Sequence, residues 1–340
     1  MELCRDVLVA IPVAETHMRQ LREAGPGCSF RFRDGMTLSP SERERLHLED
    51  FTETAPVSQE DVDWADVILG DVEEHFLHGG EKLKWLQTSW AGVETYVKPG
   101  VLAPGTILTN ATGAYSLAIS EHMLAMTLTI LKKLELYRDA QHREQWESLG
   151  AVRSIYGSTV LILGMGDTGG TFGRQCKALG ANVVGVRRAD TTKPDYADEV
   201  HLTRDLDALL PQADIVAVTL PGTAATRNLL DRRRIGLMKP GAILLNTGRG
   251  CIVDTEALCD ALECGALGGA GLDVVQPEPL PAGHRLWRIP TAVVTPHISG
   301  GWHLKETHTC VVNIFAENLK RFLVGEPLKN QVDFATGYRK

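Results

Sequence analysis

Arg249, Glu278 and His297 have the side chains that reduction of a carbonyl group requires, and they follow three successive apolar segments. Arg249 comes after "AILLN", Glu278 lies in the loop after "GLDVV", and His297 comes after "AVVTP". A guanidinium binds a carboxylate through two hydrogen bonds and polarises a neighbouring carbonyl. An imidazole exchanges a proton near neutral pH, and a hydrogen-bonded glutamate fixes its tautomer and stabilises the imidazolium. The three residues therefore predict reduction of a 2-keto acid.

A glycine-rich hexapeptide earlier in the chain supplies the place for a hydride donor. Its residues, which fit G-x-G-x-x-G, are Gly164, Met165, Gly166, Asp167, Thr168 and Gly169. The pattern follows the apolar segment "STVLIL", opens a helical stretch and precedes a second apolar segment, "ANVVGV". In that context the glycines permit a tight turn and close approach of a pyrophosphate to a helix N-terminus. The hexapeptide predicts dinucleotide binding.

Two arginines stand where such sites usually carry an acid. Arg187 lies 23 positions after Gly164, at the end of the second apolar segment, and Arg188 follows it. A carboxylate at this point binds the ribose hydroxyls of NAD and would repel a 2′-phosphate. A guanidinium can instead bind that phosphate and stack on the adenine. The pair predicts a preference for NADP(H), with NAD(H) as the alternative, unless both arginines are merely solvated surface residues.

Short apolar segments alternate with helical stretches along most of the chain. One alternating series covers residues 1 to about 105, and a second begins at Ser158. This alternation predicts the α/β class, with parallel sheets covered on both faces. Because ligands bind at the carboxyl ends of such strands, the residues after each strand should form the site. The longest helical stretch, residues 117–142, is expected to be a crossover between domains or, alternatively, a core helix.

Composition limits the classes of protein that need to be considered. The chain has 340 residues, 44% hydrophobic residues and a net charge of −8, which are values of a globular protein and not of a general nucleic-acid binder. No apolar run reaches the ~18 residues that a membrane span needs, and the N-terminal segment lacks the features of a signal peptide. Seven scattered cysteines without a CxxC pair predict reduced thiols in a cytoplasmic protein and no metal site.

These motifs together resemble the D-isomer-specific 2-hydroxyacid dehydrogenases, and the resemblance extends over nearly the whole chain. "LKWLQTSWAGVETYV" is similar to the carboxylate-binding loop of that family, "TNATGAYSLAISEHMLAMTL" to its interdomain helix and "NLKRFLVGEPLKNQVD" to its C-terminal segment. The resemblance implies two doubly wound parallel-sheet domains, with a Rossmann cofactor domain (111–300) inserted in a flavodoxin-like substrate domain (1–110 plus 301–340). It also implies a homodimer formed through the long helix 117–142.

The same resemblance extends the set of expected site residues. Substrate contacts are expected from the amides of Ala91, Gly92 and Val93 and from Trp302, for which packing is the alternative role. Further cofactor contacts are expected from Leu220, Pro221, Thr247, Gly248, Asp273 and Gly300, with Asp273 facing the nicotinamide. The product would be a D-2-hydroxy acid.

Two departures from the family pattern and several alternatives stay open at this point. Arg187 replaces the usual acid, and Thr112 stands where an arginine is common, a change without a physical explanation. The same fold serves cofactor-sensing corepressors, and phosphite-type dehydrogenases keep the same trio, whereas the formate enzymes have glutamine in place of Glu278. His284 is interpreted as structural and His122 as interfacial or core. The side chain of the keto acid, which Trp90, Tyr115, Trp302 and the segment near Phe76 would contact, is not predicted.

Overall fold

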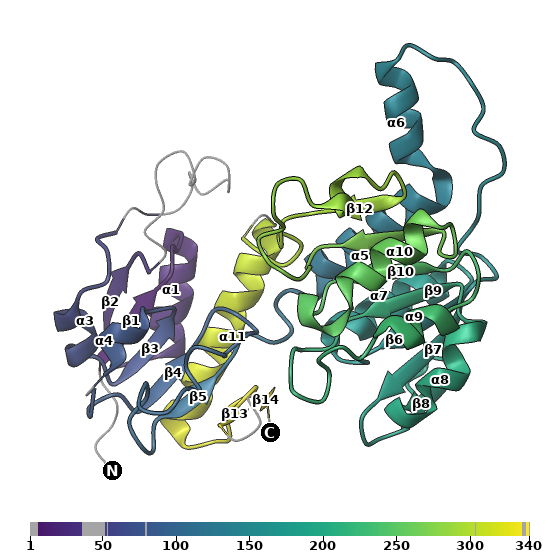
Figure 1. Cartoon of the computed structure of the whole chain (residues 1–340). Coiled ribbons are helices and arrows are strands. Elements are labelled where there is room, and N and C mark those ends of the chain that lie inside the picture. The colour runs from purple at the N-terminus through teal and green to yellow at the C-terminus, as the bar shows by residue number, and fades with distance from the viewer. Residues whose placement is uncertain are drawn as a thin grey trace. The chain divides into compact units, whose positions relative to one another are not determined.

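Two parallel β-sheets form the framework of the chain, and each belongs to its own unit (Figure 1). The computed structural model describes residues 6–35, 52, 54–78, 80–302, 304–334 and 338–339. One unit comprises Met1–Tyr115 and Trp302–Lys340, and the other comprises Ser116–Gly301. The prediction of an α/β protein with two parallel sheets is confirmed.

The first unit contains a five-stranded parallel sheet with the order β2-β1-β3-β4-β5. Its strands are β1 (Asp6–Ala10), β2 (Ser29–Arg33), β3 (Val67–Gly70), β4 (Trp85–Gln87) and β5 (Ile107–Thr109). Its helices are α1 (Glu15–Ala24), α3 (Gln59–Trp64), α4 (Glu74–Leu77) and α11 (Lys305–Val324), and a short antiparallel pair joins β13 (Val332–Asp333) to β14 (Tyr338–Arg339). Residues 7–10 of β1 are completely buried, which explains why this strand is continuously apolar.

The second unit contains a seven-stranded parallel sheet with the order β12-β11-β10-β9-β6-β7-β8. Its strands are β6 (Thr159–Leu163), β7 (Asn182–Arg187), β8 (Glu199–Leu202), β9 (Ile215–Val218), β10 (Ile243–Asn246), β11 (Gly269–Leu272) and β12 (Ala292–Val294). Its helices are α5 (Ser116–Lys132), α6 (Leu134–His142), α7 (Asp167–Ala178), α8 (Leu206–Leu209), α9 (Arg232–Leu237) and α10 (Thr255–Glu263), with 3₁₀ turns at Thr203–Asp205, Leu210–Gln212, Gly250–Ile252 and Arg285–Arg288. Counted within this unit, the strands follow the order 3-2-1-4-5-6 of dinucleotide-binding sheets, with a seventh strand at the edge.

Both faces of the second sheet are buried under helices. Leu161 and Leu163 of β6 belong to one apolar cluster, which includes side chains of α10. Their neighbours Val160 and Ile162 point to the opposite face and belong to a second cluster with α5 and α7. Because successive side chains of a strand alternate between faces, each strand must be apolar throughout to satisfy both clusters. In the described part of the chain, no helix combines the length and apolar character that crossing a bilayer requires.

The expectation of one long helix over residues 117–142 is wrong. The stretch forms α5 and α6, which are separated by Lys133 in the left-handed conformation (φ 58°, ψ 34°). The amide of Lys133 donates to Ile130, three residues back, so the regular helical hydrogen-bond ladder stops there. As a result α6 turns away from α5 and projects from its unit, and a long segment returns from its end (Figure 1). No glycine or proline marks the break, and the helical spacing of apolar residues continues through it.

Candidate active site

The predicted residues of the second unit follow the carboxyl ends of its strands. The hexapeptide Gly164–Gly169 follows β6, Arg187 ends β7 and Arg188 comes next, Leu220 and Pro221 follow β9, Thr247, Gly248 and Arg249 follow β10, Asp273 follows β11, and His297 and Gly300 follow β12. Since all seven strands are parallel, these residues lie along one edge of the sheet. In sheets of this order, ligands bind at that edge where the strand order reverses, here between β6 and β9.

The glycine turn has the local geometry that phosphate binding needs. Gly164 has a φ of 104°, and a Cβ on Gly169 would lie 2.0 Å from the carbonyl oxygen of Gly164, so the turn and the helix can pack this closely only without side chains. Gly166 precedes the first residue of α7, and a Cβ there would meet nothing within 4 Å. Thr219 Oγ1 donates to the carbonyl of Gly164 at 2.7 Å and holds the turn from the next strand in the sheet. The turn therefore leaves the N-terminus of a twelve-residue helix accessible to an anion.

Met165, the second residue of the hexapeptide, packs into the sheet. Its side chain occupies space above Gly185 in β7, where a Cβ would lie 2.6 Å from the Met165 sulfur. Met165 is buried, whereas Asp167 and Thr168 are partly exposed in the first turn of α7. The side chain of Met165 thus positions the turn against β7. A contact of Met165 with the cofactor could come only from the small part of this residue that is exposed.

Arg187 is the last residue of β7, and its side chain is already oriented. Its Nη1 donates to Asp190 Oδ2 at 3.1 Å, while Asp190 Oδ1 accepts hydrogen bonds from the amide and hydroxyl of Thr192. The hydrogen bonds from Thr192 and the charge of Arg187 lower the pKa of Asp190, so the carboxylate is ionised. Arg188 is exposed beside it. The arginine end of β7 thus presents a cation that is held by one loop acid.

A buried asparagine shapes the turn that carries Arg249. Asn246 accepts a hydrogen bond from the amide of Gly248 at 3.1 Å and donates one to the carbonyl of Arg249 at 3.1 Å. A Cβ on Gly248 would lie 2.3 Å from the Leu220 carbonyl oxygen, so this turn packs directly against the segment after β9. Arg249 itself is partly exposed, and its Nη1 donates to the carbonyl of Gly248 at 2.9 Å. The side chain of Arg249 is therefore anchored at the carboxyl end of β10.

Glu278 and His297 are in direct contact. His297 Nδ1 lies 2.5 Å from Glu278 Oε1, and the two side chains are 49% and 40% exposed. Because Nδ1 is engaged by Glu278, Nε2 is the ring nitrogen that can exchange a proton with a substrate. A histidine paired in this way can donate and accept a proton at Nε2 while the carboxylate holds the ring.

Asp273 determines where His297 lies. Its Oδ1 accepts hydrogen bonds from Thr295 Oγ1 (2.6 Å) and the Ile298 amide (2.9 Å), and its Oδ2 accepts them from the amide (3.0 Å) and hydroxyl (2.5 Å) of Ser299. The backbone amide of His297 donates to the Asp273 carbonyl at 2.9 Å, and His297 has a φ of 54°. Burial alone would raise the pKa of Asp273, but these hydrogen bonds outweigh it and lower the pKa. The carboxylate is directed at the His297 loop, and its contact with a cofactor stays a prediction.

The two other histidines that sequence analysis considered have distinct positions. His122 Nε2 lies 3.0 Å from Thr295 Oγ1 and 4.0 Å from Asp273 Oδ1, so it borders the network that holds the His297 loop. His284 Nε2 lies 3.0 Å from Glu256 in α10, and its Nδ1 accepts a hydrogen bond from the Leu286 amide. His284 therefore fixes a local 3₁₀ turn, which supports a structural role.

In the first unit, the loop after β4 presents a row of backbone amides. The carbonyl of Trp90 accepts from the Ala111 amide (3.0 Å), and the carbonyl of Ala91 accepts from Asn110 Nδ2 (2.8 Å). Within the described residues, the amides of Ala91, Gly92 and Val93 donate no hydrogen bond. Ala91 and Gly92 are also at least partly exposed. Successive unpaired amides whose carbonyls are tied back form a concavity suited to a carboxylate.

Sequence analysis named Tyr115 as a contact of the keto-acid side chain, but it did not predict that Tyr115 and Asp71 hold this loop from behind. Tyr115 Oη donates to the Ser89 carbonyl at 2.5 Å, and the Asp71 carboxylate accepts hydrogen bonds from both the amide and the hydroxyl of Ser89. Ser89 is completely buried. Asp71 directly follows the apolar segment "VILG", and that position after a strand was the available signal.

Trp302 packs within the first unit and is only 4% exposed. Its ring meets Trp90 edge-on, with centroids 5.9 Å apart, and lies 4.8 Å from the His308 ring, while its Nε1 has no hydrogen-bond partner among the described residues. Trp90, which also stacks on Tyr115, is the more exposed ring. The backbone of Thr112 bonds to Asn110 and Asn330, and nothing in the structure explains its side chain.

The second unit fits a nicotinamide dinucleotide in three respects. The glycine turn leaves space beside Gly166 at a helix N-terminus, and Arg187 provides a cation at the end of the neighbouring strand. Thr247 Oγ1, after β10, is buried without a hydrogen-bond partner in the described part of the chain. A buried hydroxyl without a partner is costly unless another molecule bonds to it. These residues therefore match the donor set that a bound dinucleotide requires.

Comparison with known proteins agrees with this geometry. The family model for the NAD binding domain of D-isomer specific 2-hydroxyacid dehydrogenases matches residues 124–299. A glyoxylate/hydroxypyruvate reductase B from Pectobacterium carotovorum subsp. carotovorum (strain PC1) is 32% identical over 276 residues, which cover 78% of this chain and 83% of that protein.

Two solved structures have the same fold over almost the whole chain. A D-isomer specific 2-hydroxyacid dehydrogenase family protein from Aeromonas salmonicida subsp. salmonicida A449 has a TM-score of 0.79 and 30% identity, covering 97% of this chain and 99% of that one. A D-isomer specific 2-hydroxyacid dehydrogenase from Xanthobacter autotrophicus Py2, solved in complex with NADPH and MES, has a TM-score of 0.78 and 25% identity, covering 99% and 100%. The chain therefore belongs to the D-isomer specific 2-hydroxyacid dehydrogenase family of oxidoreductases.

Proposed function

We propose that this enzyme reduces a 2-keto acid to the D-2-hydroxy acid with NADPH. The observation that carries the proposal is the 2.5 Å contact between His297 and Glu278, on the same sheet edge as the glycine turn. The relatives named glyoxylate/hydroxypyruvate reductase B support a small keto acid as substrate. A nicotinamide dinucleotide bound by the glycine turn, Thr247 and Arg187 would supply the hydride.

The other groups that the reaction needs come from the chain itself. The amides of Ala91, Gly92 and Val93 bind the substrate carboxylate, and Arg249 binds it in a planar fork and polarises the keto oxygen. His297 donates a proton from Nε2 to the oxygen as negative charge develops there. Glu278 accepts a hydrogen bond from Nδ1–H, keeps the ring in this orientation and stabilises the imidazolium before transfer.

A panel of 2-keto acids, assayed by loss of NADPH absorbance, tests this function. His297→Ala should lower kcat by about 10²–10⁴-fold, because it removes a positioned general acid. His284→Ala is the matched control, since His284 also follows Glu278 but bonds to Glu256. NADPH binding should survive in both variants. A parent that reduces no keto acid, or a His297→Ala variant of parental activity, would contradict the proposal, and phosphite oxidation or NADPH binding without turnover would favour the alternatives.

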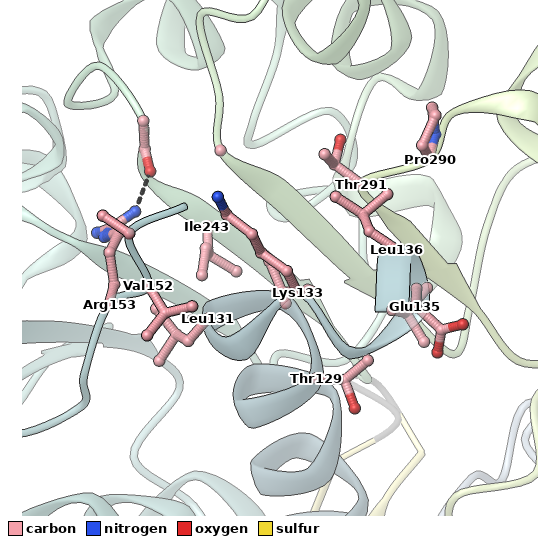
Figure 2. Close-up of a pocket in the computed structure, with 15 residues that line it drawn as sticks. Thr129, Leu131, Lys133, Glu135, Leu136, Val152, Arg153, Ile243, Pro290 and Thr291 are labelled. Atoms are coloured by element: carbon pink, nitrogen blue, oxygen red, sulfur yellow. Dashed lines mark hydrogen bonds between the residues drawn. The ribbon is translucent and has the colours of Figure 1, made fainter. Parts of the chain in front are cut away.

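We also propose that the enzyme is a homodimer that associates through α6. Exposed apolar side chains occur in α6 and in the chain on either side of it: Leu128 in α5, Leu134 in α6, and Trp146, Val152 and Tyr156 in the segment that follows, of which Trp146 is fully exposed. At the base of α6 lies a hollow of about 270 Å³, and Figure 2 shows Leu131, Leu136, Val152 and Ile243 around it. Arg153 bonds to the carbonyl of Gly241 at its edge. Apolar area of this kind on a projecting arm favours burial against a second copy.

The oligomeric state can be measured by sedimentation equilibrium at several concentrations. Leu134→Glu should yield monomers, because an unpaired charge in an apolar interface is costly. Val324→Glu, at the exposed end of α11 in the first unit, is the matched control and should leave the dimer intact. A monomeric parent would refute the dimer without affecting the proposed reaction.

A further inference from the structure

A carboxylate lies directly behind the loop that presents the free amides. Asp71 follows β3, and its Oδ1 accepts from the Ser89 amide at 3.1 Å while its Oδ2 accepts from the Ser89 hydroxyl. Ser89 is two residues before Ala91, the first of the three amides. Asp71 as a whole residue is partly exposed. A fixed negative charge therefore borders the place where the proposed function puts a substrate carboxylate.

Holding the loop does not require this charge. Tyr115 Oη already bonds to the Ser89 carbonyl, Thr88 Oγ1 bonds to both backbone groups of Trp90, and Asn110 bonds to Ala91. An uncharged acceptor at position 71 could bond to Ser89 as well. Placing a carboxylate here has an electrostatic cost, because partial burial disfavours its charged form. The charge therefore calls for a reason other than the shape of the loop.

The ionisation of Asp71 is sensitive to its surroundings. Burial raises its pKa to about 6, although the two hydrogen bonds from Ser89 act in the opposite direction. Two phenols face it, Tyr96 from the loop after β4 and Tyr115, and their pKa values are raised by burial and secondly by the Asp71 charge. Neither phenol supplies a cation, so above about pH 7 the site contains a carboxylate that has no opposite charge among these neighbours.

Such a carboxylate would act on whatever group the substrate carries beyond its keto acid. A hydroxyl or ammonium could donate a hydrogen bond to it, a methyl group could not, and a second carboxylate would be repelled. Resting on the proposed function, we propose that Asp71 determines specificity: it selects 2-keto acids whose side chain carries a hydrogen-bond donor and rejects those with a second carboxylate.

Four 2-keto acids that differ only in their side chains test this proposal at about pH 8, where Asp71 is ionised. Glyoxylate has no side chain, pyruvate has a methyl, hydroxypyruvate adds a hydroxyl, and oxaloacetate adds a carboxylate. The parent should prefer hydroxypyruvate to pyruvate and to oxaloacetate by at least about tenfold in kcat/KM, because a matched donor is favoured and like charges repel. A parent that reduces oxaloacetate as well as hydroxypyruvate overturns the proposal without any variant.

Asp71→Asn keeps the shape and removes the charge. It should reduce the hydroxypyruvate-to-oxaloacetate ratio at least about tenfold. Glyoxylate has no side chain, so any change in its kcat/KM measures how far Asp71 supports the loop, and the ratio is compared after that common factor is removed. Ser89→Ala, which removes a hydrogen bond to Asp71 but keeps the charge, should retain the parental ratio. Glu73→Gln, an exposed acid two residues away in the same loop, controls for general loss of negative charge.

Each outcome separates this inference from the proposed function. An equal loss of kcat/KM on all four substrates in Asp71→Asn would mean that Asp71 only supports the loop, and the proposal would be wrong. Unchanged ratios in Asp71→Asn would overturn it too. If that variant fails to fold, the ratios of the parent and of Ser89→Ala still decide. Failure of the proposed function would be visible as a parent that reduces none of the four.

Discussion

If the proposed preference for NADPH rests on Arg187, the Arg187→Gln variant should distinguish poorly between NADPH and NADH. Arg187 ends β7, is 27% exposed on its side chain and bonds to Asp190 through Nη1 alone, so further N–H groups of the guanidinium are available for a 2′-phosphate. A hydrogen bond to a charged group contributes about 1.5–3 kcal/mol, and about 2 kcal/mol corresponds to roughly 30-fold. We therefore expect kcat/KM for NADPH to fall roughly 30-fold.

The assay is initial-rate kinetics with NADPH and NADH on the same preferred keto acid. The parent should use NADPH at least about tenfold better, a difference of ~1.4 kcal/mol. NADH, which lacks the phosphate, should be used equally by parent and Arg187→Gln, and Arg187→Asp should reverse the preference. Asp190→Asn should improve NADPH use, because it releases the guanidinium from a competing carboxylate.

Arg188→Gln is the matched control, because Arg188 is the adjacent and more exposed arginine. Its effect on NADPH should be small. Equal use of NADPH and NADH by the parent would refute the reasoning, as would an Arg187→Gln variant that loses both cofactors equally. If kcat/KM for NADPH fell as much in Arg188→Gln as in Arg187→Gln, Arg188 would also have to contact the 2′-phosphate.

Three further changes test other groups. Arg249→Lys should lose at least about tenfold in kcat/KM, far more than Arg187→Lys, because ammonium cannot reproduce a planar two-point contact; parental kinetics in Arg249→Ala would remove its carboxylate role. Glu278→Gln should move the loss of reductive kcat with rising pH toward lower pH, since the imidazolium of His297 loses its carboxylate, and superimposable profiles would contradict this. Burial, and secondly His17, lowers the pKa of His308 to about 4, below its unfolded value, so the unfolded state binds more protons as pH falls from about 6.5 to 4. The parent should therefore lose about 2 kcal/mol of stability relative to His308→Gln between pH 7 and pH 5, measured by urea unfolding with tryptophan fluorescence; parallel pH dependences would exclude this role.

Strand ends were predictable from sequence because the strands of a buried parallel sheet are apolar throughout and stop abruptly at polar residues. The segment before Gly164 and the segment before Arg249 end where the structure ends β6 and β10, within a residue or two. The glycine pattern was equally readable, since Gly164 needs its positive φ and Gly169 its lack of a side chain. Local backbone geometry of this kind can therefore be predicted from residue type.

Contacts between residues that are far apart in the sequence could not be predicted from residue type in this way. Asp71 and Ser89 are 18 positions apart and meet only because β3 and β4 are neighbours in the sheet. The contact of Asp273 with a cofactor stays a prediction. The four hydrogen bonds that its carboxylate accepts from the segment after β12 were not predicted, because no spacing rule indicates them. The break at Lys133 was not predicted either, because a lysine in the left-handed backbone conformation does not change the spacing of the apolar residues around it.

The hydrogen bonds of Asp273 mean that the connection between β11 and β12 need not be continuous for His297 to be held. That connection contains an exposed turn, Pro281–Gly283, where Gly283 has open space around it. A single proteolytic cut there would place Asp273 and Glu278 on one polypeptide and His297 on another. Strand pairing and the Asp273 hydrogen bonds would still join the two pieces. We therefore expect the two pieces, made separately, to associate, with the proposed acid–base pair divided between two polypeptides.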